Sequence, residues 1–211
     1  MDFSSRFSGR DGAGDWLISP LEGEIGCVNA FAITAETAAD VAAREALLDR
    51  AMGPGRKRKS SEKLRRGRKP SEGLAFAARG ADGRIVGTVR LWDVAVASRS
   101  ALLLGPLAVD PSLKNAGIGA ALMRHAIAEA RRLGHRAILL VGDAPYYGRF
   151  GFSVEKTGSL AMPGPYERHR LLALQLQEGA LDGACGVIAA TGRRLEARRI
   201  AGSRSGHVVA L

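Results

Sequence analysis

The residues with the clearest chemical meaning are the two glycines of the loop Lys114-Asn-Ala-Gly117-Ile-Gly119. An apolar stretch that reads as a strand, residues 101–109, leads into this loop, and a helical pattern of apolar residues follows it. Free backbone N–H groups at a helix start bind phosphate groups, and the positive end of the helix dipole adds to the attraction. The order strand, glycine loop and helix therefore predicts an anion site that can hold a pyrophosphate.

Two familiar phosphate loops do not match these residues. A P-loop closes a Gly-x4-Gly frame with Lys-Ser or Lys-Thr, and no such pair is present in residues 117–122. A dinucleotide-binding fingerprint needs a third glycine, and Leu122 stands at that position. A bare Gly-x-Gly also occurs in turns that bind nothing, so the loop alone leaves a purely structural interpretation open.

The bulk composition describes an ordinary globular chain with a marked positive charge. Its 211 residues suit one domain, with 46% hydrophobic and 25% charged residues. A net charge of +10 favours anionic ligands: nucleic acid, acidic membranes, acidic carrier proteins or phosphorylated cofactors. Cys27 and Cys185 have no metal-ligand spacing and suggest neither a zinc site nor a disulfide framework. No signal peptide or apolar run of about 18 residues is visible, which predicts a soluble cytoplasmic protein.

The first third of the chain contains a segment of unusual charge. Residues 1–30 read as a flexible arm, 31–33 as a short strand, and 37–52 as a helix that Thr37 and Asp40 cap. Nine of the fourteen residues in 56–69 are basic, so we expect this segment to be exposed. It could be a solvated face, a surface for an acidic acceptor or carrier protein, or a nucleic-acid site. The absence of interleaved aromatic residues disfavours single-stranded nucleic acid.

The remaining elements predict a mixed sheet. Residues 74–79 and 84–92 form a hairpin, and 101–109 form a central strand that Pro106 must interrupt because proline cannot donate to the ladder. A helix over 117–133, a strand over 136–141, a helical turn over 146–150 and a strand over 171–176 follow. The basic tail from residue 191 onward has no clear pattern. This order indicates an α+β layered fold rather than strict βαβ repetition.

In the glycine loop and the segments around it, the sequence resembles the GNAT superfamily of N-acetyltransferases. The acetyl-CoA motif of that family, Gln/Arg-x-x-Gly-x-Gly/Ala, matches residues 114–119, with Lys114 in place of the usual Gln or Arg. Residues 104–111, 138–152 and 163–168 are similar to the YhbS-like branch of predicted acetyltransferases. The resemblance covers roughly residues 31–190, which sets the expected domain between an arm (1–30) and a tail (191–211).

This resemblance implies a fold and a set of coenzyme-binding residues. The fold is a mixed, mostly antiparallel sheet that is splayed at its central strands, with helices on both faces. The N–H of Leu107 would stabilise the oxyanion of the thioester, and Leu107, Ala108 and Val109 would follow the pantetheine. The pyrophosphate would lie on the loop residues Lys114, Asn115, Ala116, Gly117, Ile118, Gly119 and Ala120.

The resemblance also implies a proton donor. Family members commonly use a tyrosine before a Gly-Phe pair to protonate the departing thiolate, and Tyr147 holds that position. We expect Tyr146 to be a packing residue. The sequence identifies no general base: Asp93, Asp143 and Glu167 are candidates that suit caps, turns or the surface equally well, and solvent could accept the proton.

The predicted function is therefore transfer of an acetyl group from acetyl-CoA to a primary amine, by direct attack in a ternary complex and with no metal. One alternative is a non-catalytic basic module of the same fold that binds CoA or nucleic acid. Another is an acyltransferase that uses longer acyl groups or carrier-protein thioesters. The acceptor is not identifiable from the motifs. Residues 56–69 could contact nucleic acid or an acidic carrier protein, and a homodimer is compatible with the sequence.

Overall fold

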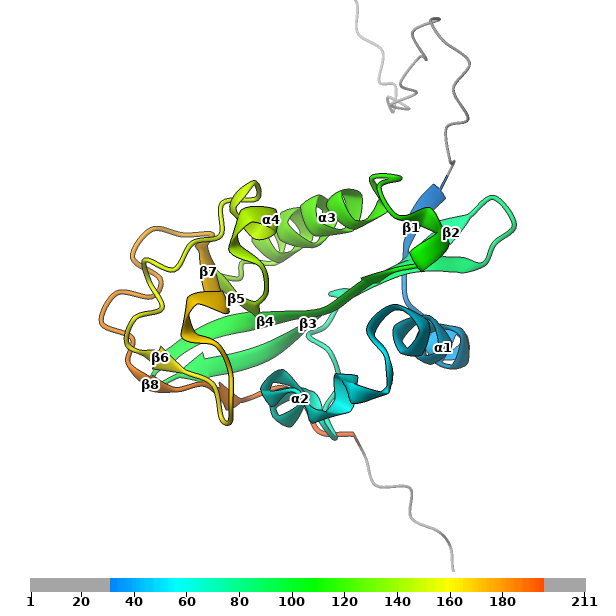
Figure 1. Cartoon of the computed structure of the whole chain (residues 1–211). Coiled ribbons are helices and arrows are strands. Elements are labelled where there is room, and N and C mark those ends of the chain that lie inside the picture. The colour runs from blue at the N-terminus through cyan, green and yellow to red at the C-terminus, as the bar shows by residue number, and fades with distance from the viewer. Residues whose placement is uncertain (1–30, 196–211) are drawn as a thin grey trace, which may run out of the picture.

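The computed structural model describes residues 31–195, so the predicted arm (1–30) and most of the predicted tail (191–211) lie outside the described residues. A seven-stranded sheet forms the centre of this range (Figure 1). Its path is β1 (Phe31–Ala35), β2 (Ala75–Gly80), β3 (Ile85–Val96), β4 (Arg99–Val109), β5 (Ala137–Val141) and β7 (Leu171–Gln175), and β9 (Ala189–Ala190) pairs with β3.

The strand pairing agrees with the predicted mixed sheet. The β4–β5 pair is parallel, and every other neighbouring pair in this sheet is antiparallel. The β2–β3 hairpin forms where the Asp82-Gly83 turn predicts it. Two short strands, β6 (Leu160–Ala161) and β8 (Gly186–Val187), form a separate parallel pair.

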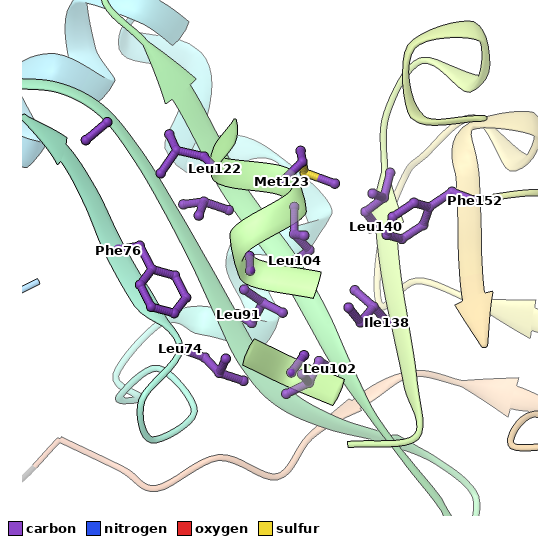
Figure 2. Close-up of a cluster of buried hydrophobic side chains, with 14 of the residues drawn as sticks. Leu74, Phe76, Leu91, Leu102, Leu104, Leu122, Met123, Ile138, Leu140 and Phe152 are labelled. Carbon is purple, nitrogen blue, oxygen red and sulfur yellow. The ribbon is translucent and has the colours of Figure 1, made fainter. Parts of the chain in front are cut away.

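Helices cover both faces of the sheet, as expected. In Figure 1, α3 (Ile118–Arg132) and α4 (Ala144–Gly148) lie on one face, and α1 (Val41–Met52) and α2 (Ser60–Arg65) lie on the other. Leu122 and Met123 of α3 pack over buried leucines of β3, β4 and β5 (Figure 2). The apolar stripe at steps of three and four therefore fixes α3, and with it the glycine loop, against the sheet.

The two central strands separate where Pro106 interrupts β4. Within the described chain, β5 pairs with β4 at Leu102 and Leu103. Beyond this point β4 remains paired with β3, but the register shifts between Val89 and Leu91, opposite Gly105-Pro106. The expected break at the proline is confirmed, and it leaves the remainder of β4 with an edge that faces away from β3.

The expectation that residues 56–69 are exposed is wrong for two of the arginines. The segment forms a 3-10 turn (Pro54–Arg58) and then α2, and the side chains of Arg56 and Arg65 are only 11% and 10% exposed. Arg56 reaches back to α1, where Glu45 and Asp49 accept its hydrogen bonds at 2.6 and 2.7 Å. Carboxylates that lie outside the basic run therefore allow its charges to be partly buried.

The chain continues in contact with the domain at the start of the predicted tail. The N–H groups of Thr191 and Gly192 donate to the carbonyl oxygen of Asp93. Farther on, Leu195 donates to the carbonyl of Gly67 at 2.8 Å, and Lys69 donates to that of Arg193. The end of the basic segment thus lies beside residues 191–195. In the part of the chain that is described, no helix has the length and apolarity needed to cross a membrane.

Candidate active site

The glycine loop forms one wall of a hollow of about 320 Å³, which we call the loop cavity. Val109, at the end of β4, and Tyr146 and Arg149, at α4, complete its walls. Its other lining residues are Leu113, Lys114, Asn115, Ala116, Gly117, Ile118, Gly119 and Ala120. The hollow thus collects all of the predicted pyrophosphate-binding residues at one place.

The loop has the backbone geometry of an anion site. Asn115 and Gly117 both have positive φ angles, +68° and +77°, and α3 begins immediately afterwards at Ile118. Residues other than Gly and Asn rarely adopt this left-handed backbone conformation, which explains why Asn and Gly occupy positions 115 and 117. Alternation of such residues with ordinary ones turns successive N–H groups to the same side of the loop. With the N-terminus of a 15-residue helix, they form an electropositive cradle.

Two further residues fit the cavity to a pyrophosphate-bearing ligand. A Cβ on Gly119 would come within 3.0 Å of the Tyr146 hydroxyl and 3.5 Å of Val109, so the bare glycine keeps the hollow open. The guanidinium of Arg149 lies 4.2 Å from the centre of the Tyr146 ring and 5.0 Å from that of Phe150. This stacking holds a cation at the edge of the phosphate cradle. Arg149 was not among the predicted site residues, although it lies within the motif Tyr-Tyr-Gly-Arg-Phe-Gly-Phe.

A second hollow, of about 100 Å³, lies at the interruption in β4, and we call it the bulge cavity. One wall is β4 from Leu104 to Leu107, and another is the segment that contains α2. The complete lining is Met52, Arg56, Lys59, Ser61, Glu62, Arg65, Leu104, Gly105, Pro106, Leu107, Val141 and Tyr147. Leu107 and Tyr147, the two predicted catalytic residues, therefore line the same cavity.

The Tyr147 ring is held from several sides. It makes edge contacts with Tyr146, at 4.9 Å between ring centres, and with Phe152, at 6.1 Å. A Cβ on Gly142, directly after β5, would overlap the Tyr147 ring, so only glycine permits this approach. Burial raises the pKa of Tyr147 to about 12, and the neighbouring Tyr146 adds to the shift. The phenol therefore keeps its proton throughout the neutral range.

The interrupted part of β4 is fixed by its neighbour β3. The indole N–H of Trp92 donates to the carbonyl oxygen of Gly105 at 2.6 Å. Arg90 lies over the Trp92 ring at 5.8 Å, and Glu36 accepts a 2.7 Å hydrogen bond from the Arg90 Nε. The backbone immediately before Pro106 is thus held by the Trp92 side chain as well as by the strand ladder.

Two other residues named from the sequence, Ala108 and Tyr146, lie in different surroundings. Ala108, a predicted coenzyme-binding residue, lines neither cavity; its side chain is buried and it pairs with Thr88. Tyr146 packs against Tyr147, as expected, but also lines the loop cavity.

None of the base candidates Asp93, Asp143 and Glu167 lies in the lining of the bulge cavity. That lining instead contains one carboxylate, Glu62, which sequence reasoning missed. It is the one acidic residue within 56–69, and this isolation is the signal that could have identified it.

Comparison with known proteins places this architecture in a family. The family model described as Acetyltransferase (GNAT) family matches residues 41–152, just over half of the chain and including both cavities' central residues. The Escherichia coli K12 protein called uncharacterized N-acetyltransferase YhbS is 27% identical over 117 residues, which are 54% of this chain and 70% of that protein.

Two solved structures share the fold of this chain. The crystal structure of Escherichia coli YhbS in complex with CoA has a TM-score of 0.66 at 23% identity and covers 80% of this chain and 94% of its own. A GNAT family acetyltransferase from Brucella melitensis, in complex with acetyl-CoA, has a TM-score of 0.52 at 26% identity and covers 73% of this chain and 99% of its own. The fold is therefore that of an acyl-CoA N-acyltransferase. The chain belongs to the GNAT acetyltransferase family, as its motifs predict.

Proposed function

We propose that this protein is an N-acetyltransferase that uses acetyl-CoA and a primary amine. The observation that carries the proposal is the position of the two cavities along a single strand. Val109 lies in the loop cavity and Leu107, two residues earlier, in the bulge cavity. A coenzyme whose pyrophosphate occupies the loop and whose arm follows the open edge of β4 would bring its thioester to Leu107 and Tyr147.

The alternation of backbone groups along β4 supports a role for the Leu107 N–H. The N–H of Asp110 donates to the carbonyl of Val86, in β3, at 2.8 Å. Successive N–H groups of a strand point to opposite edges, so those of Val109 and Leu107 point away from β3. There they are positioned to donate to the pantetheine and to the carbonyl oxygen of the thioester. Hydrogen-bond donors of this kind stabilise the oxyanion that develops as the amine attacks.

Tyr147 supplies the proton in the proposed reaction. The acceptor nitrogen forms a bond to the carbonyl carbon, the bond from that carbon to sulfur breaks, and the thiolate takes the phenolic proton of Tyr147. A neutral phenol is the required starting form, and with a pKa of about 12 Tyr147 is in this form at neutral pH. The phenol recovers its proton from solvent after the products depart.

Glu62 is positioned to accept the proton that the amine loses. It lies in the bulge cavity with Leu107 and Tyr147, and its side chain is 24% exposed. An ionised carboxylate that retains contact with solvent can pass a proton to bulk water. We therefore propose Glu62 as the general base, acting directly or through one water molecule.

The proposal is tested in two measurements on the full chain. Titration calorimetry with acetyl-CoA measures coenzyme binding, and release of free CoA thiol measures transfer to a panel of primary amines. We expect binding, and thiol release that depends on an added amine. Binding without transfer to any amine would instead favour a non-catalytic CoA-binding module.

Four related expectations remain predictions. Transfer from longer acyl-CoA thioesters, but not from acetyl-CoA, would favour the acyltransferase alternative with a different donor. Salt-dependent binding to RNA or DNA would favour the nucleic-acid interpretation of residues 56–69. A cytoplasmic location and a homodimer also remain to be measured.

A further inference from the structure

The bulge cavity contains more positive charge than coenzyme binding requires. Three cationic side chains, Arg56, Lys59 and Arg65, are part of its lining, and Glu62 is the single carboxylate there. All four come from residues 56–65, on the side of the cavity opposite β4. The phosphate cradle lies in the other cavity, so these charges face the space left for the acceptor.

Of the two largely buried cations in this lining, Arg56 and Arg65, the protein satisfies Arg65 less completely. Its side chain is 90% buried, since only 10% of its surface is exposed, and its Nε atom is buried without a hydrogen-bond partner among the described residues. Its Nη2 atom lies 3.3 Å from both Ser61 Oγ and Glu62 Oε2. Charge-assisted hydrogen bonds are usually about 2.7–2.9 Å long, so these contacts hold the guanidinium loosely. A buried, partly unsatisfied guanidinium indicates a missing anionic partner.

The neighbouring arginines already have partners. Arg56 is bound by Glu45 and Asp49, and Arg90, behind the bulge, is bound by Glu36. Burial lowers the pKa of Arg65, the positive charges of Arg56 and Arg90 add to this shift, and Glu62 opposes it. The field at Arg65 therefore favours an additional negative group.

The same guanidinium lies close to the reacting strand. Its Nη1 atom is 3.7 Å from the position that a Cβ on Gly105 would occupy, and Gly105 lies two residues before Leu107. This is an ordinary contact distance, so the guanidinium lies beside the strand where it opens. A group bound by Arg65 would thus lie near the proposed position of the thioester carbonyl.

We propose that the acceptor is a small amine that carries an anionic oxygen group, a carboxylate or a phosphate, and that Arg65 and Lys59 bind this group. This inference rests on the proposed function. Glu62 and Arg65, 3.3 Å apart, form a dipole that complements a molecule with an amine at one end and an anion a few atoms away. The volume of about 100 Å³ suits such a small molecule better than a bulky one.

The test compares amines of matched length that differ in charge. β-Alanine is compared with n-propylamine for the carboxylate, and 2-aminoethyl phosphate with ethanolamine for the phosphate. Thiol release from saturating acetyl-CoA is measured at constant ionic strength, because salt screens exposed charges. We expect kcat/KM to favour at least one anionic member by roughly 10- to 100-fold, the usual effect of one charged hydrogen-bond pair. The favoured member distinguishes a carboxylate from a phosphate.

Two variants assign the preference to Arg65. In Arg65→Gln we expect the kcat/KM values for the anionic and neutral amines to become nearly equal, because KM for the anionic amine rises. Arg65→Lys should retain part of the preference, because it keeps the charge and loses the planar donor pair. Arg66→Gln is the matched control: it removes a neighbouring exposed arginine that does not line the cavity, and the preference should be unchanged.

A binding measurement separates failure of this inference from failure of the proposed function. Thermal stabilisation of the CoA-bound protein by β-alanine or 2-aminoethyl phosphate requires no turnover, and it should be lost in Arg65→Gln. Transfer that favours neutral amines would overturn the inference and leave the enzyme assignment intact. A preference that survives in Arg65→Gln would also overturn it. Stabilisation by anionic amines without any transfer would support the anion site and contradict the proposed catalysis.

Discussion

The indole of Trp92 binds the carbonyl oxygen of Gly105 at 2.6 Å, across the two central antiparallel strands and at the point where their register shifts. This bond fixes the peptide group that precedes Pro106. The Leu107 N–H, the proposed oxyanion donor, belongs to the next peptide group along this irregular part of β4. We therefore expect the Trp92 side chain to help position the proposed oxyanion donor.

We expect Trp92→Phe to lower kcat clearly, with only a small loss in the free energy of unfolding. The change keeps an aromatic ring but removes a hydrogen bond, which contributes about 1 kcal/mol to folding. The Leu107 N–H would then be less well aligned, so kcat should fall while KM for acetyl-CoA changes little. Tyr166→Phe is the matched control, since it removes a 3.2 Å hydrogen bond to the Leu160 carbonyl away from both cavities. Equal kcat in both variants would contradict this positioning role.

Tyr147→Phe tests the proton donor. Loss of a general acid typically costs about 100-fold or more in rate, and we expect this loss in kcat with acetyl-CoA affinity preserved. Tyr146→Phe removes the neighbouring hydroxyl and should retain most of kcat. An unchanged kcat in Tyr147→Phe would remove this residue from the mechanism.

The raised pKa of Tyr147 has a consequence for stability at high pH. The folded protein holds the phenolic proton up to a pKa of about 12, whereas an unfolded chain loses it near the usual tyrosine value of about 10. This contribution to stability is complete below pH 10 and is lost as pH rises toward 12. Chemical denaturation between pH 9 and 12 should therefore show a steeper loss of stability in the wild type than in Tyr147→Phe. Parallel curves would show that the ring is not effectively buried.

Gly119→Ala tests the loop cavity. The new methyl group would lie 3.0 Å from the Tyr146 hydroxyl and narrow the cradle, so we expect weaker acetyl-CoA binding by calorimetry, by roughly 10-fold. Adding Tyr146→Phe removes the atom that the methyl group meets, and the double variant should recover part of the affinity. Gly158→Ala, where a Cβ would have open space, is the control. No change in affinity would place the coenzyme elsewhere.

Glu62→Gln tests the proposed base. We expect kcat/KM to fall by roughly 10-fold or more at neutral pH, and the loss to shrink as rising pH deprotonates the amine in solution. Glu72→Gln, an exposed carboxylate paired with Arg193 outside the bulge cavity, should leave the pH–rate profile unchanged. A pH-independent loss in Glu62→Gln would indicate a role in acceptor binding rather than proton transfer.

The sequence predicted the fold well, and it located the loop and the break in β4, because these features depend on local patterns. The apolar stripe of α3, the positive-φ positions of the loop and the proline in β4 each determine a nearby backbone conformation. Tyr147 follows from its fixed spacing to Phe152, and the structure brings it into the same cavity as Leu107.

The acceptor side was not predictable in the same way, because its geometry depends on contacts between distant residues. Burial of Arg56 requires carboxylates that α1 presents, and the position of Arg65 beside Gly105 joins residues 40 apart in the chain. Charge density alone therefore predicted a uniformly exposed segment. Glu62 stands out in the sequence as the one acid of the basic run, but only the structure shows that it shares the bulge cavity with Leu107 and Tyr147.

The two cavities draw on largely separate stretches of the chain. Residues 52–65 contribute six members of the bulge cavity, whereas the loop cavity is built from residues 109–120, Tyr146 and Arg149. If the proposed reaction holds, mutations in the first stretch would alter the choice of amine and leave recognition of the thioester donor unchanged. Acceptor specificity would then diversify through one short segment at a time.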